Sequence, residues 1–103
     1  MNKSLIEFIE ANGSWRYDSG FFVIDQAPEG DSPVITAEAT FLDLEGYYGE
    51  WERLNGYYVT IHPSTNMFQY WIKKYGDEPI IDDGFKEWTD ARMAAFNKVC
   101  ELI

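Results

Sequence analysis

The sequence predicts an α+β fold in which residues 1–103 form a single domain. A short N-terminal helix precedes an antiparallel meander of four to five strands, and a C-terminal amphipathic helix packs on one face of the sheet. Three observations support this. Apolar residues recur at helical spacing near the N-terminus, alternate with polar residues through the middle of the chain, and return to helical spacing after Thr89. No repeat, low-complexity tract or linker divides the chain.

The first helix is expected from Leu5 to Asn12. Ser4 and Glu7 have the spacing of a capping box, in which each side chain bonds to the backbone of the other residue. Gly13 provides a C-terminal stop.

The next segments are predicted as strands. Trp15–Tyr17 and Phe21–Gln26 flank a hairpin-like turn at Asp18-Ser19-Gly20. Ala27–Pro33 contains two prolines and a glycine, so we expect a loop there. Val34–Leu42 alternates between apolar and polar residues, as a half-buried antiparallel strand does.

Two further hairpins are expected. Asn55-Gly56, a frequent hairpin turn, should join a strand at Tyr48–Arg53 to one at Tyr57–His62. Pro63–Asn66 makes the next turn, and Met67–Tyr75 is the last long strand.

The closing helix is expected to start at Thr89 as its N-cap, with Asp90 in the first turn. It then continues without Gly or Pro and places one apolar stripe toward the sheet: Ala91, Ala95, Val99 and Leu102.

Eighteen acidic side chains against eight basic ones give a net charge of −10. Nine of the acids lie in Tyr17–Glu52, an interval without a single Lys or Arg. This balance argues against direct nucleic-acid binding, which depends on clustered basic residues. The interval is either a solvated face or an anionic surface for a basic partner.

The sequence offers little for catalysis, so we expect a protein that is not an enzyme, without cofactor, metal or catalytic residues. Cys100 is the single cysteine and is interpreted as a packing residue. His62, the only histidine, lies at a strand end with no partner indicated. Asp82-Asp83-Gly84 is too incomplete for a calcium loop, and no phosphate-binding glycine motif occurs.

Aromatic residues crowd the central hairpins. By alternation Tyr57, Val59 and Ile61 share one strand face and Tyr58, Thr60 and His62 the other. The first set suits the contact with the closing helix. Tyr58, Met67 and Trp71 would then point outward, unless the first helix and Tyr47–Trp51 cover that face as well. Both alternatives stay open.

The closing segment Phe85–Phe96, which contains Thr-Asp-Ala-Arg at the helix entry, resembles the endings of small accessory proteins of phages and mobile elements. No named family is matched. The resemblance implies a protein that occupies the surface of a host protein.

The leading functional hypothesis is an acidic protein-interaction module, in one form a phage or mobile-element inhibitor that occupies a basic surface of a host nucleic-acid-handling defence protein. The alternatives are a small-ligand or carbohydrate-binding module and an accessory virion subunit; homo-oligomerisation stays open. We expect no leader and no membrane span, and hence the cytoplasm of a bacterial or phage-infected cell. The predicted partner-binding residues are Glu38, Glu45, Glu50, Trp51, Glu52, Tyr58 and Trp71.

Overall fold

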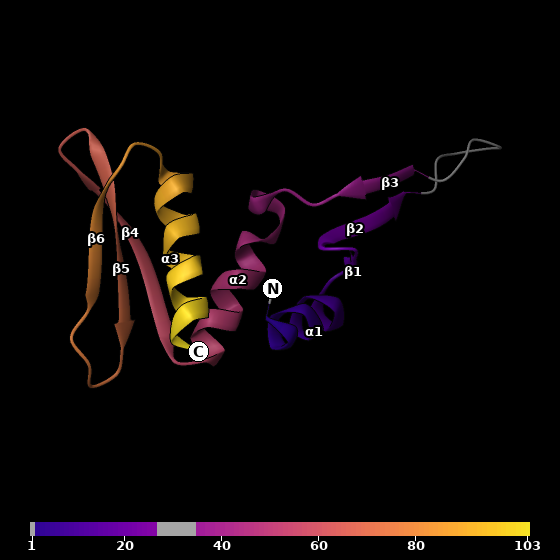
Figure 1. Cartoon of the computed structure of the whole chain (residues 1–103), viewed down its shortest axis with the longest axis horizontal. Helices are drawn as coiled ribbons and strands as arrows, with labels where there is room; N and C mark the ends of the chain where they lie inside the picture. Colours follow the sequence, from indigo (N-terminus) through magenta and orange to yellow (C-terminus); the bar gives the residue numbers. More distant parts are fainter. Residues whose placement is uncertain (1, 27–34) are drawn as a thin grey trace. The chain divides into compact units, whose positions relative to one another are not determined.

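A computed structural model describes residues 2–26 and 35–103. It contains, in this part of the chain, three helices and two three-stranded antiparallel sheets (Figure 1). The predicted α+β class is therefore confirmed, although the strands form two separate sheets rather than one meander. The chain divides into two compact units, Met1–Tyr47 and Tyr48–Ile103. That residues 1–103 form one domain stays a prediction.

The first unit begins with helix α1 (Lys3–Asn12). Its cap is Asn2, whose side-chain oxygen accepts a hydrogen bond from the Ser4 backbone N–H at 2.8 Å. The predicted cap at Ser4 is therefore wrong, because Ser4 lies within the first turn. The apolar stripe behaves as expected, since Leu5 and Ile9 are fully buried.

Strands β1 (Arg16–Asp18), β2 (Phe21–Gln26) and β3 (Ile35–Glu38) form the first sheet. Ser19 and Gly20 both adopt positive φ, which a two-residue hairpin turn of this kind requires, and the predicted hairpin is confirmed. Arg16 Nη2 donates to Asp25 Oδ1 at 3.2 Å, and Thr36 Oγ1 donates to the same oxygen at 2.9 Å. Both bonds hold the pKa of Asp25 below its ordinary value. The loop expected at Ala27–Pro33 lies outside the described residues.

Helix α2 (Phe41–Leu54) replaces two predicted strands. The strand expected at Val34–Leu42 stops at Glu38, and the strand expected at Tyr48–Arg53 is helical. Thr40 starts the helix through a reciprocal box: its backbone N–H donates to Asp43 Oδ2 at 2.8 Å, and the Asp43 N–H donates to Thr40 Oγ1 at 3.3 Å.

Asn55-Gly56 ends this helix and does not join two strands, so the hairpin expected there is wrong. The Gly56 N–H donates to the Arg53 carbonyl at 2.9 Å, and Gly56 has φ +88°. The left-handed conformation favoured by glycine is as useful after a helix as it is in a hairpin.

The second unit contains strands β4 (Tyr57–Ser64), β5 (Met67–Lys74) and β6 (Ile80–Phe85) and helix α3 (Trp88–Leu102), which packs on one face of the sheet (Figure 1). β4 and β5 match the sequence prediction within two residues at each end. β6 was not expected, because Asp82, Asp83 and Gly84 are poor strand formers. The predicted N-cap at Thr89 is wrong, because helix α3 starts at Trp88. The N-cap position is Glu87, which makes no side-chain cap bond.

The core of this unit lies between the sheet and its helices. Tyr57, Tyr70 and Ile72 are buried on the sheet, and Ala91, Ala95, Phe96 and Val99 are buried on α3. The Tyr48 ring of α2 stacks on the Phe96 ring, with centroids 4.0 Å apart. As predicted, the Tyr57 side of β4 meets the closing helix.

A buried ion pair crosses this core. Arg92 of α3 donates from Nη1 to Glu52 Oε2 of α2 at 3.0 Å and from Nη2 to Glu52 Oε1. The side chains are 4% and 1% exposed. The two-pronged geometry of guanidinium on carboxylate satisfies both charges and fixes the register of α2 on α3.

Removing either charge should destabilise the protein strongly, since the other charge then lies buried and unpaired. We expect Glu52→Gln and Arg92→Met each to lower the free energy of unfolding by about 3 kcal/mol, measured by urea denaturation. The double variant Glu52→Met/Arg92→Met should recover most of this loss. Single variants within about 0.5 kcal/mol of the parent would show that the pair is not closed in solution.

Candidate interaction surface

The second sheet has a face that α3 does not cover, here called the outer face. Side chains alternate along a strand, and opposite residues of antiparallel strands share a face. The register pairs Tyr58 with Lys73, Thr60 with Trp71, and Trp71 with Ile81. The outer face therefore includes Tyr58, Thr60, His62, Ser64, Met67, Gln69, Trp71, Lys73 and Ile81.

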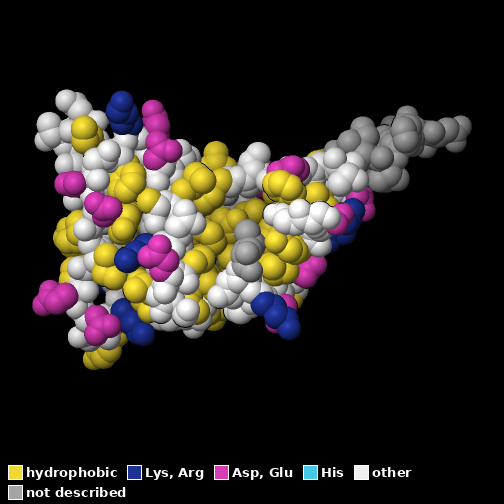
Figure 2. All heavy atoms as spheres, in the orientation of Figure 1, with side chains coloured by type: hydrophobic (Ala, Val, Ile, Leu, Met, Phe, Trp, Pro, Cys, Tyr) yellow, Lys and Arg dark blue, Asp and Glu magenta, His cyan; other side chains and the backbone are white. Residues whose placement is uncertain are grey.

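Large apolar side chains of the outer face stay open to solvent. Tyr58 is 53%, Ile81 47% and Met67 43% exposed, whereas their neighbours Tyr57 and Ile72 on the opposite face are buried. Figure 2 shows hydrophobic side chains reaching the surface over the part of the molecule formed by β4–β6 and α3. Within the second unit, Tyr58 and Met67 are therefore not covered by α3. The alternative in which the first helix covers this face stays a prediction.

Trp71 lies at the centre of the outer face and is half-buried. The His62 ring lies against it, with centroids 5.2 Å apart, and Thr60 Oγ1 holds His62 Nε2 at 2.8 Å. The Trp71 indole N–H is buried without a hydrogen-bond partner among the described residues. The ring is thus fixed by packing and not by a polar contact.

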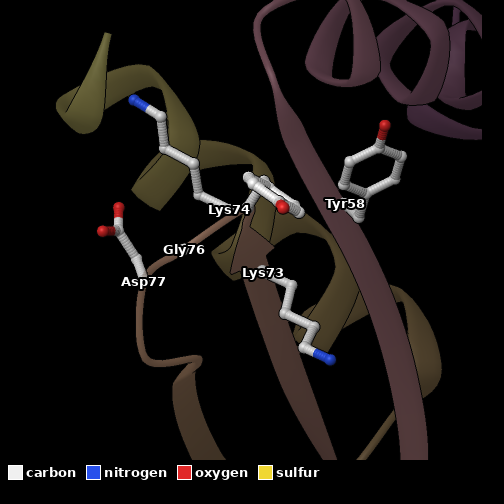
Figure 3. A pocket seen from close by; sticks show the side chains of 6 residues that line it. Tyr58, Lys73, Lys74, Gly76 and Asp77 are labelled. Carbon is white, nitrogen blue, oxygen red and sulfur yellow. The ribbon is translucent and has the colours of Figure 1, made fainter.

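A shallow hollow of about 280 Å³ opens at one end of this sheet. Its lining residues are Tyr58, Lys73, Lys74, Tyr75, Gly76 and Asp77. Figure 3 shows the Lys73 and Lys74 amino groups pointing away from each other. Lys74 Nζ instead lies 5.1 Å from the centre of the Tyr57 ring, a cation–π contact. The two lysines therefore do not converge on one anion.

Within the second unit, the predicted partner-binding residues Tyr58 and Trp71 share one face of the sheet. Glu38 is exposed on β3, Glu45 is half-buried in α2 and Glu50 is exposed in α2. The expectation that Trp51 and Glu52 are surface groups is wrong, because they are 2% and 1% exposed.

The acids of α2 do not form one surface. Glu50 and Glu52 are two residues apart, which in a helix turns their side chains by about 200°. One therefore points to solvent while the other meets Arg92. In a strand, residues two apart share a face. Because this segment was predicted as a strand, Glu50 and Glu52 were expected on one surface.

Ile81 is a member of the outer face that sequence reasoning missed. It lies on β6, the strand that was not expected. The pair Ile80-Ile81 after Pro79 was the available signal, since β-branched residues favour strands.

Cys100 is half-buried on α3. Burial raises the pKa of the Cys100 thiol, and the Glu52 carboxylate raises it further, so the thiol stays protonated at neutral pH. No group of three or more potential metal ligands occurs within residues 2–26 and 35–103. In the same residues, no helix is both long and apolar enough to cross a membrane.

Trp71→Phe tests the unpartnered indole. The change removes a buried N–H that has no acceptor, so we expect the free energy of unfolding to change by less than about 1 kcal/mol. Trp51→Phe, a matched change at a fully buried site, should cost about 2 kcal/mol by leaving a cavity. Urea denaturation measures both, and a larger cost at Trp71 than at Trp51 would contradict the assignment.

No protein family model, no curated protein and no solved structure matches this chain.

Proposed function

We propose that this protein is a non-enzymatic interaction module that binds a protein partner through the outer face. The observation that carries the proposal is the exposure of Tyr58, Met67 and Ile81 on one face of one sheet. Large apolar side chains exposed along one face are typical of interaction sites.

The composition of the outer face suits protein recognition. Tyr58 and Trp71 supply large contact areas with few rotatable bonds, so a complex loses little side-chain entropy. Aromatic residues of this kind dominate the energies of protein interfaces, above all near the centre. Thr60, His62 and Gln69 provide polar groups among them.

The charge of the chain favours a basic partner. The first unit, Met1–Tyr47, contains nine acidic side chains and two basic ones. Such an excess accelerates encounter with a positively charged protein and repels acidic ones. A nucleic-acid-handling protein of a host cell, blocked by a phage or mobile-element product, is the specific form of this proposal.

A second candidate function is binding of a small neutral ligand such as a sugar. It is favoured by the hollow, where Tyr58 and Tyr75 provide aromatic surface. Sugars stack on exposed aromatic rings, and saturable tryptophan fluorescence changes with a panel of sugars would support this candidate.

Affinity capture from the native host, followed by binding measurements with the purified partner, tests the main proposal. Tyr58→Ser and Ile81→Ser should each weaken binding about tenfold or more, because each removes an exposed apolar contact. Met93→Ser is the matched control: Met93 is 44% exposed but lies on α3 and not on the outer face.

The proposal is contradicted if Met93→Ser weakens binding as much as Tyr58→Ser does. The basic-partner component has its own check. Affinity should fall as salt rises, and an affinity independent of salt would remove that component while leaving the outer face as the contact.

A further inference from the structure

The chain contains two Asn-Gly dipeptides, and each lies at the C-terminal end of a helix. Asn12 is the last residue of α1, and Asn55 directly follows α2. Asparagine is a chemically labile residue, and it is most labile before glycine, which has no Cβ to hinder the approach of its backbone nitrogen. Two copies of one reactive dipeptide thus lie in different surroundings.

Loss of the side-chain amide, or deamidation, needs only these two residues and water. The glycine backbone nitrogen attacks the asparagine Cγ, so an N–Cγ bond forms and the Cγ–Nδ2 bond breaks. Nδ2 leaves as ammonia and takes the backbone amide proton with it. Water then opens the five-membered imide at either carbonyl, which produces aspartate or isoaspartate. The glycine nitrogen must therefore be able to lose its proton and to reach Cγ.

The fold opposes this attack at Asn55. The Gly56 N–H, which carries the proton to be lost, donates to the Arg53 carbonyl at 2.9 Å. The Asn55 side chain donates from Nδ2 to the Trp51 carbonyl at 2.8 Å, and Trp51 is almost completely buried. The Asn55 backbone N–H donates to the same carbonyl at 3.2 Å. Both reacting groups are therefore held by a part of α2 that is anchored in the core.

Asn12 makes the equivalent side-chain bond at an exposed position. Its Nδ2 donates to the Phe8 carbonyl at 2.8 Å in the last turn of α1. Asn12 itself is exposed, whereas Asn55 is half-buried. The ends of helices open more readily than segments anchored in a core, because fewer contacts must break. The side chain of Asn12 is therefore released far more often than that of Asn55.

We propose that Asn12 is a site of spontaneous deamidation in the folded protein, whereas Asn55 is protected. The reaction changes the end of α1. A carboxylate cannot donate to the Phe8 carbonyl, and its charge lies at the negative end of the helix dipole. Aspartate or isoaspartate at position 12 therefore destabilises the last turn of α1. This inference does not depend on the proposed function, because neither dipeptide lies on the outer face.

Peptide mass spectrometry of the full chain, incubated at neutral pH and physiological temperature, tests the proposal. We expect Asn12 to deamidate about tenfold or more faster than Asn55 in the folded protein, because the end of α1 opens more often. In concentrated urea the two rates should become similar, since the fold no longer distinguishes the two dipeptides. Asn12→Gln is the matched control. It keeps an amide donor but would have to form a six-membered ring, so deamidation at position 12 should be lost while the rate at Asn55 stays unchanged.

Equal rates at the two sites of the folded protein would overturn the proposal, as would a faster reaction at Asn55. A difference that persists in urea would also overturn it, because the difference would then come from the neighbouring residues and not from the fold. Asn12→Asp checks the consequence for α1. Amide hydrogen exchange within Phe8–Asn12 should become faster while exchange in α3 does not change, and unchanged exchange in α1 would contradict the destabilisation of its last turn.

Discussion

The buried pair of Arg92 and Glu52 is the interaction on which the second unit depends. Burial of a guanidinium and a carboxylate costs both groups their hydration energy. Only a bidentate ion pair such as that of Arg92 and Glu52 offsets this cost. The pair therefore permits one arrangement of α2 against α3. Apolar contacts alone would tolerate small shifts of one helix along the other, whereas the pair does not.

The order of the remaining core follows from this contact. With Glu52 held, Tyr48 one turn earlier stacks on Phe96, and Trp51 meets the edge of the same ring. These aromatic groups fill the space on the α3 side of the sheet. Tyr48 and Trp51 of α2 are thereby buried, whereas Tyr58, Met67 and Ile81 of the outer face stay exposed.

Much of the fold could be predicted from local patterns. Alternation found β4 and β5 and separated Tyr57 from Tyr58, and helical spacing found α1 and α3. Helix α2 was missed although Thr40 and Asp43 have capping-box spacing, because Gly46, Gly49 and two tyrosines weaken its intrinsic helix preference. Tertiary burial of Tyr48 and Trp51 outweighs that preference. Asn55-Gly56 correctly predicted a residue with positive φ, Gly56. Such a dipeptide does not indicate whether a helix or a strand precedes it.

The residues of the outer face could be predicted only where the secondary structure around them was predicted correctly. Tyr58 and Trp71 lie on strands that alternation identified, so their common face followed. The buried position of Glu52 could not be predicted in this way, because its partner Arg92 is forty residues away in sequence and no local pattern joins them. A count of acids gives the total charge but not which acid is withdrawn into the core.

Oxidative surface labelling of the free protein, read residue by residue by mass spectrometry, tests the central claim most directly: that α2 and α3 fill one side of the second sheet and leave the other open. The account predicts strong labelling of Tyr58 and Met67 and little of Tyr48 and Trp51 at a dilution where the protein is monomeric. Tyr58 and Met67 protected to the level of Trp51 would show that the outer face is covered and would contradict the account.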